Sequence, residues 1–207
     1  MLAASFFCFQ IAGVSQSRVG ISAGVAFANM KDKVEGTSRP GIMTSMILDV
    51  PLGKKKNFSF HPTLSYVQKG QSDNIPPGSP VDKQYTALRY AELATDFIFN
   101  KLGPKGGFFI GAGPSVSFNL PSKSVTVIAK TKTSTIVTFG KTPAQNLRGV
   151  DYGADFTAGW RTTGGFILSF NYNKGLRNLY SGLGTGEIKN SYFGVQLGMF
   201  LNNGDGK

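Results

Sequence analysis

The chain has 207 residues, and its 22 Lys and Arg against 11 Asp and Glu give a net charge of +11, although only 16% of its residues are charged. This length favours one domain, and the single cysteine excludes both a disulfide-stapled fold and a zinc module built on cysteine ligands. No apolar run reaches about 18 residues, which excludes a polytopic helical membrane protein. Abundant glycine (27 residues) and aromatic residues (12%) favour strands. A membrane β-barrel, whose strands bury only alternate residues, is therefore still allowed.

Residues 1–15 predict a signal peptide. The uncharged apolar stretch over residues 2–14 is too short to span a bilayer but has the length of a signal-peptide hydrophobic region. Small residues at Gly13 and Ser15 permit cleavage before Gln16. Because no basic segment precedes the stretch, we expect the natural start to lie upstream of Met1. A buried first strand or helix is the alternative. Residues 16–207 then form the barrel domain.

From Arg18 onward, apolar residues recur at every second position, which is the period of a strand. Eight segments show this alternation, each of roughly 9 to 13 residues, which matches the 9 to 11 that a tilted strand needs to cross the hydrocarbon layer. They cover residues 18–28, 42–50, 58–66, 88–100, 107–119, 151–161, 166–173 and 193–201.

The connections between these segments alternate in length. Those after the second, fourth and sixth segments are short, at 52–57, 101–106 and 162–164, and the others are long, at 29–39, 70–87, 120–148 and 174–190. Short periplasmic turns and long extracellular loops are the plan of an outer-membrane barrel. The sequence therefore predicts an all-β fold, an eight-stranded antiparallel up-and-down transmembrane β-barrel in the bacterial outer membrane.

The two faces of the segments differ in a way that separates two kinds of barrel. A soluble barrel encloses its large apolar side chains, whereas a membrane barrel turns them outward. Here the second face is small and polar, and glycine recurs on it, at Gly20, Gly24, Gly111, Gly113, Gly153, Gly159, Gly194 and Gly198. Such glycines would form a poor hydrophobic core, so we expect this face to line the lumen. A soluble periplasmic lipocalin-like barrel that binds an apolar ligand is the alternative.

Four ionisable residues of the polar face lie towards the short-turn ends of their strands: Arg18, Asp49, Asp96 and Arg161. An isolated charge in a narrow lumen is costly, so these side chains are expected to form an ion-pair network that plugs the barrel. A proton or ion path is the less favoured interpretation, because eight strands leave no open channel.

Catalytic and cofactor chemistry have little support in the sequence. His61 is the one histidine, and although Ser59, Thr63 and Ser65 share its face, no orienting partner for a dyad is evident. We expect no enzyme activity, no metal and no cofactor. The basic charge is not gathered with aromatic residues on one element, so nucleic acid is not an expected partner.

The basic charge does gather in one predicted extracellular loop. Residues 120–148 contain no acidic residue and five cations, Lys123, Lys130, Lys132, Lys141 and Arg148. We expect these to bind anions such as the phosphates of lipopolysaccharide, with an ordinary solvated loop as the alternative. Residues 125–128 and 135–139 read as the arms of a hairpin. They are short for two more spanning strands, so a protruding extension is expected.

Several motifs resemble the PorT-like outer-membrane β-barrel family of Bacteroidetes, small relatives of the OmpA-type barrel. They are RVGISAG at 18–24, HPTLSYVQKG at 61–70, YAEL at 90–93, FIGAGP at 109–114, NYNKGL at 171–176 with LY at 179–180, and SYFGVQLGMF at 191–200. The resemblance implies the same barrel and, for some members, service to a gliding-associated protein secretion system.

We therefore expect a non-enzymatic integral outer-membrane barrel with a structural or surface-binding role. The expected partners are outer-membrane lipid, lipopolysaccharide and envelope or secretion-system proteins, and the expected state is a monomer. An enzyme acting on envelope lipid ranks below the soluble barrel.

Overall fold

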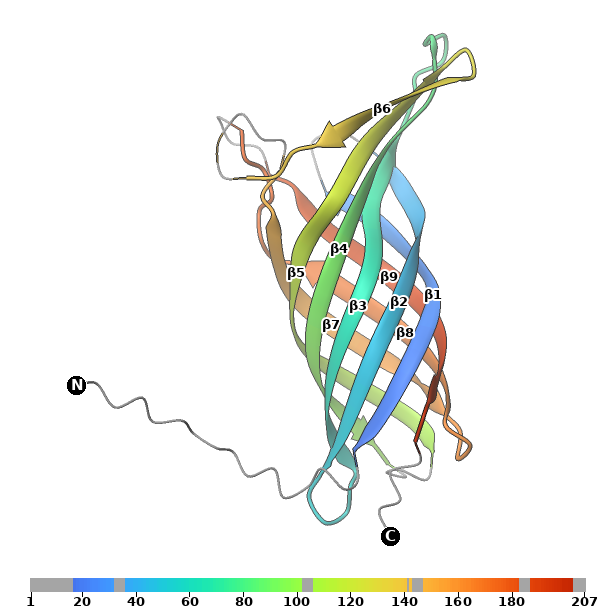
Figure 1. Ribbon diagram of the computed structural model, residues 1–207, viewed down its shortest axis with the longest axis vertical. Helices are drawn as coiled ribbons and strands as arrows, with labels where there is room; N and C mark the ends of the chain where they lie inside the picture. The colour runs from blue at the N-terminus through green and yellow to red at the C-terminus, as the bar shows by residue number, and fades with distance from the viewer. Residues whose placement is uncertain are drawn as a thin grey trace, which may run out of the picture.

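The computed structural model describes residues 17–31, 36–101, 106–140, 142, 147–182 and 187–202. The predicted signal peptide and Lys141 lie outside these residues. The described chain is built from strands joined by turns and loops (Figure 1). The strands are β1 (Arg18–Lys31), β2 (Gly36–Leu52), β3 (Phe58–Asp73), β4 (Val81–Asn100), β5 (Gly107–Ile128), β6 (Thr131–Val137), β7 (Val150–Arg161), β8 (Phe166–Gly175) and β9 (Lys189–Phe200).

Eight of these strands close into a ring of antiparallel neighbours. The order runs β4-β3-β2-β1-β9-β8-β7-β5, and pairing between β4 and β5 completes the ring. β1 and β9 join the two ends of the chain, from Gly20 opposite Phe200 to Lys31 opposite Lys189. The predicted eight-stranded up-and-down barrel is confirmed. No helix in the described ranges is long and apolar enough to cross a membrane.

The strands rise further at the long-loop rim than the sequence predicts. The connections expected at 29–39 and 70–87 fall largely within strands, because pairing continues from Ala28 opposite Arg39 and from Gly36 opposite Asp73. Exposed polar residues such as Thr37 and Lys83 interrupt the apolar alternation on these extensions, while the backbone still pairs. The short turns behave as expected, as between β2 and β3, where the Lys56 amide donates to the Gly53 carbonyl at 3.2 Å.

The wall of the barrel has an apolar outer face. Large side chains on this face are exposed, as Phe97 (61%), Trp160 (56%) and Leu197 (69%) illustrate, while the residues that alternate with them are buried and mostly small or polar. A soluble barrel with an apolar ligand site would need the reverse arrangement. The outward band of apolar and aromatic side chains instead matches a lipid-facing surface.

Glycine on the inner face allows neighbouring strands to approach closely. A β-carbon added to Gly24 would lie 1.9 Å from the Val195 carbonyl oxygen on β9, a distance that no side chain tolerates. The glycine-rich pattern of the inner face thus reflects tight strand packing as well as a narrow lumen.

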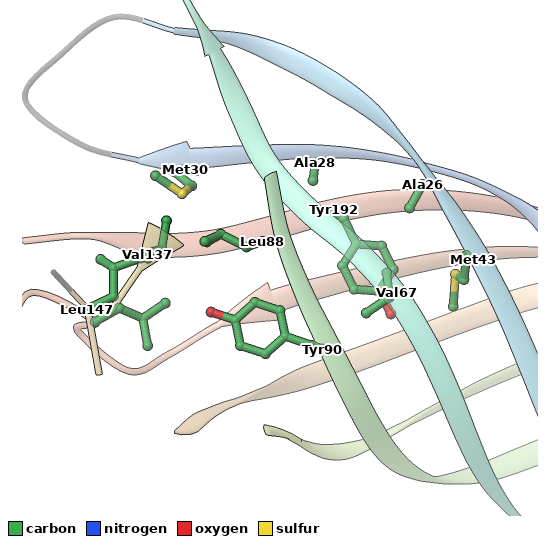
Figure 2. Packing of buried hydrophobic residues seen from close by; sticks show 11 residues of the cluster. Ala26, Ala28, Met30, Met43, Val67, Leu88, Tyr90, Val137, Leu147 and Tyr192 are labelled. Carbon is green, nitrogen blue, oxygen red and sulfur yellow. The ribbon is translucent and has the colours of Figure 1, made fainter. Parts of the chain in front are cut away.

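Two apolar clusters lie inside the barrel, one towards each rim. Ile47, Ile98, Phe109, Ile167 and Phe200 pack together near the short turns. The cluster at the other end includes Met30, Val67, Leu88, Tyr90 and Tyr192 (Figure 2). Val137, Leu147 and Leu179 reach it from the long-loop segments, and the Leu147 amide donates to the Thr138 carbonyl at 3.2 Å. The long loops thus supply apolar residues that cover the mouth.

A second group of loop contacts holds this cover in place. The Arg148 amide donates to the Leu179 carbonyl at 2.8 Å, and the Leu179 amide donates to the Ile188 carbonyl at 2.7 Å. The loop between β6 and β7 is therefore tied to the loop between β8 and β9.

Candidate functional site

Three of the four residues predicted to plug the lumen meet near the short turns. Arg18 on β1 lies directly opposite Asp49 on β2, and its Nε donates to Asp49 Oδ2 at 3.1 Å. Arg161 at the end of β7 donates from Nη1 to the same oxygen at 3.0 Å. All three side chains are buried. One carboxylate between two guanidinium groups is a charge-assisted arrangement suited to a lumen with little water.

Asp96 does not join this group, and its predicted place in one network with the two arginines is wrong. On β4 it lies opposite His61 of β3, which separates it from Asp49 on β2. Its carboxyl instead lies near that of Asp155 on β7, and both line the same small cavity.

Gly113 on β5 explains why Asp96 and Asp155 can meet. It pairs with Asp155 on β7, and a β-carbon added to it would lie 2.0 Å from the Thr95 carbonyl oxygen and 2.8 Å from the Asp96 α-carbon. The absent side chain thus leaves room between two acids two strands apart. Asn173 on β8 completes the group by donating from Nδ2 to Asp155 at 3.1 Å and to Ser115 at 2.7 Å.

A buried Lys69–Glu92 pair forms a third group, which the sequence analysis did not identify. Lys69 Nζ donates to Glu92 Oε2 at 2.7 Å, and both side chains are almost completely buried. Ser117 and Tyr192 also donate to Glu92, at 2.6 Å and 2.5 Å. The ammonium group lies 5.1 Å from the ring centre of Tyr90 and 5.1 Å from that of Tyr192, within the range of cation–π attraction.

A signal for Lys69 was present in the sequence. His61, Thr63 and Ser65 occupy the inward positions of β3, and two further steps of two residues reach Lys69. The predicted strand ended at Tyr66, so Lys69 fell outside it, whereas β3 continues to Asp73.

The space left between these groups is small. A cavity of about 40 Å³ lies among polar side chains of the lumen, including His61, Asp96, Asp155 and Gln196. At 10 to 15 Å³ for each water position, it holds about three waters. Within the described residues, this cavity is too small for an open channel or for a lipid-sized ligand.

His61 has no catalytic arrangement around it. Within the described ranges, no hydrogen bond joins its ring to Ser59, Thr63 or Ser65, and Ser65 Oγ instead bonds Ser45 Oγ at 2.8 Å. Nor does this part of the chain contain a group of three His, Cys, Asp or Glu side chains placed to hold a metal ion.

The predicted basic loop forms two parts, a hairpin made by β5 and β6 and a segment that covers the mouth of the barrel. β6 folds back on β5 outside the ring, so residues 131–137 do not span the membrane. Lys130 and Lys132 are exposed near the hairpin tip, Lys123 is half-buried on β5, and Arg148 is half-buried in the loop that covers the mouth. The four of the five predicted cations that the structure describes therefore do not form one cluster.

Two basic residues of other strands, Lys83 of β4 and Arg39 of β2, belong to the same region as Lys123 and Lys132. Pairing places Lys83 of β4, Val127 of β5 and Lys132 of β6 in one row, and residues directly opposite one another share a face of a sheet. Tyr85 and Lys123 follow on that face, and the guanidinium carbon of Arg39 lies 5.1 Å from the Tyr85 ring centre. We call Lys83, Tyr85, Lys123, Lys132 and Arg39 the basic face. Lys83 and Arg39 could be found only once the strand register was known.

A family model and several solved structures are similar to this chain. No curated protein matches the sequence significantly. Among solved structures, Neisserial surface protein A (NspA) has 10% sequence identity and a TM-score of 0.44, with 89% of this chain and 96% of that chain covered. Ail, the attachment invasion locus protein of Yersinia pestis, has 10% identity and a TM-score of 0.43, with coverage of 89% and 99%. The model of the family described as "Outer membrane protein beta-barrel domain" matches residues 10–181, and the chain therefore belongs to this family of outer-membrane barrels.

Proposed function

We propose that the chain is a non-enzymatic surface-binding barrel whose basic face holds phosphate groups of lipopolysaccharide. The observation that carries this proposal is the row Lys83–Val127–Lys132, which spans three strands above the lipid-facing wall. Strands in a sheet are about 4.8 Å apart, so two cations lie roughly 10 Å from each other on one face. That spacing suits an anion with more than one phosphate.

Aromatic and basic side chains reinforce one another on this face. The Lys83 Nζ lies 5.5 Å from the Tyr85 ring centre, and Arg39 contacts the same ring. Lys130 lies at the hairpin tip, where its amide donates to Asp82 Oδ2 at 3.1 Å. This bond fixes the tip while the Lys130 side chain stays exposed.

Cations also border the lipid-facing band itself. Lys174 follows the outward-facing Tyr172 by two residues on β8, and Arg89 precedes Ala91 by two on β4. Both are at least partly exposed and lie at the long-loop end of the apolar band, where positive charge would be attracted to an anionic membrane surface. The barrel therefore presents basic residues from this end of the apolar band up to the hairpin.

Binding of purified barrel to lipopolysaccharide in detergent, at two salt concentrations, tests this proposal. The variant K83Q/K123Q/K132Q should bind about tenfold more weakly at low salt, because each exposed contact contributes up to about 1 kcal/mol. Its salt dependence should flatten, since exposed charges are screened over about 8 Å at physiological ionic strength.

A variant at the opposite rim provides a matched control. K54Q/K55Q/K56Q removes the same charge from the β2–β3 turn and should leave lipopolysaccharide binding unchanged. Equal loss in both triple variants would reduce the effect to net charge and overturn the proposal.

We further propose that the chain is a PorT-like member of its family, monomeric in the membrane, and associated with secretion-system proteins of the envelope. The motifs that carry the resemblance supply Lys69, Glu92 and Tyr192, which meet in the lumen. The resemblance thus rests on interior packing, and its link to secretion needs a separate test. Deletion of the gene should reduce export of secreted cargo, and unchanged export would remove this part of the proposal.

A further inference from the structure

β6 is a strand with one neighbour. It pairs with β5 through seven residue pairs, from Ser122 opposite Val137 to Ile128 opposite Thr131, and it ends the sheet order. Every ring strand of the described chain has at least two neighbours, and β5 has three, β4, β6 and β7. β6 alone among the described strands lacks a neighbour on one side along its whole length.

The hairpin turn determines which backbone groups face this edge. Ala129 and Lys130 both have positive φ angles, 46° and 67°, as in a two-residue type I′ turn. Such a turn makes Ile128 and Thr131 a hydrogen-bonded pair, and bonded pairs then alternate along the ladder. The N–H and C=O groups of Lys132, Ser134 and Ile136 consequently point away from β5, and none of the backbone hydrogen bonds that join described residues outside the strand ladders involves them.

The side chains along this edge are open to a partner. Residues 131–136 are all exposed, and Ile136 is 76% exposed. Natural proteins protect free edges with proline, bulges, charged side chains or covering loops, because an unprotected edge can pair with another chain. Lys132 is the one charged residue of β6, and it repels basic partners while it attracts acidic ones. β6 contains no proline, and its register with β5 runs without a bulge.

We propose that β6 accepts an extended, acidic segment of another envelope protein as an added strand. Main-chain hydrogen bonds to Lys132, Ser134 and Ile136 would provide affinity, and side chains at alternate positions would provide selectivity. Lys132 and Ile136 share one face, four residues apart. The matching segment therefore has an acidic residue opposite Lys132 and an apolar residue four positions away, opposite Ile136.

Charge favours such a partner over a second copy of this chain. Residues 120–148 contain five Lys or Arg and no acidic residue. Two hairpins pairing edge to edge would bring together two basic segments with no acidic residue in residues 120–148 of either copy, which is repulsive. An acidic strand meets the same cations with attraction.

The test uses the purified full chain in detergent micelles and a labelled, end-capped peptide, Thr-Val-Thr-Ser-Thr-Glu-Thr. In antiparallel pairing this peptide sets its Val opposite Ile136 and its Glu opposite Lys132. Binding should slow amide hydrogen exchange at Lys132, Ser134 and Ile136, while Thr133 and Thr135, already bonded to β5, should change little. A peptide with Lys in place of Glu should bind several-fold more weakly.

Two substitutions of Ser134 test the role of the edge hydrogen bonds without changing any charge. Ser134→Pro removes one outward donor, which an edge strand tolerates, and should weaken peptide binding about tenfold. Ser134→Ala should change binding less than about twofold, and unchanged exchange at Thr133 and Thr135 would show that the hairpin is intact. Equal binding by both variants, or a wild-type barrel that self-associates and ignores the peptide, would overturn the proposal. Neither variant alters the cations tested with lipopolysaccharide, so the two proposals fail separately.

Discussion

The lower and upper halves of β5 differ in what surrounds them. Below, β5 lies between β4 and β7 in a closed ring, and its inward side chains contact buried polar groups. Above, it lies between β4 and β6, and β6 has an open edge. The same strand thus belongs to the closed wall below and to an open sheet above. The two regions differ because the closed ring pairs both edges of its strands, whereas the sheet above ends in an unpaired edge.

Two lysines show the same contrast. Lys69 is 1% exposed and fully engaged by Glu92, Ser117 and two aromatic rings. Lys132 is exposed on β6. Removal of a charged partner in the lumen should therefore lower the stability of the barrel. Removal of a cation on the hairpin should instead weaken ligand binding. The following variants test this division.

The largest effect is expected in the lumen. Glu92→Ala leaves the buried Lys69 charge without its partner and should lower the free energy of unfolding by about 3 to 5 kcal/mol. The double variant Lys69→Met, Glu92→Leu should lose less, because it leaves no unpaired charge. Urea unfolding in lipid vesicles measures both. A single variant as stable as the wild type would show that Lys69 is not buried as a charge.

The next effect concerns the outer face of the wall. Phe156→Arg places a cation near the bilayer midplane and should cost about 2 to 4 kcal/mol. Thr157→Ser on the inner face of the same strand should have little effect, since Thr157 is buried among polar groups. Equal sensitivity of the two faces in the same unfolding measurement would contradict the assignment of inside and outside.

A smaller effect is expected where strands approach closely. Gly113→Ala places a β-carbon 2.0 Å from the Thr95 carbonyl oxygen and should destabilise the barrel by about 1 to 3 kcal/mol through forced separation of β4 and β5. Gly164→Ala is the control, because its β-carbon would have one neighbour, Thr162 Oγ1 at 3.8 Å. Identical stabilities would mean that the wall yields without penalty.

The smallest effect on stability is expected on the hairpin sheet. K123Q/K132Q removes two charges from its basic face and should change the free energy of unfolding by less than about 0.5 kcal/mol, as is usual for surface substitutions. A larger loss would show that the hairpin belongs to the cooperative unit of the wall, and the division drawn above would fail.

Periodicity was sufficient for the barrel and insufficient for its interior. Alternation located Arg18, Asp49 and Arg161 on the inner face near the short turns, where they meet. Alternation also placed Asp96 on the inner face, but it did not show where Asp96 lies along the barrel axis relative to residues of strands on the far side of the ring. That position depends on the stagger between strands, which a single strand does not encode.

The sequence by itself determined which residues face lipid, how many strands close the ring and where the charge-rich loop lies, because a period of two residues is a local property. Only the tertiary structure decided which of these residues lie together. It brings Lys69 to Glu92, Asp96 near Asp155 across Gly113, and Lys83 into one row with Lys132. Each of these joins residues distant in the chain through strand register. Register follows from ring closure and from the two-residue turn at Ala129 and Lys130, and so it emerges only when all strands are assembled.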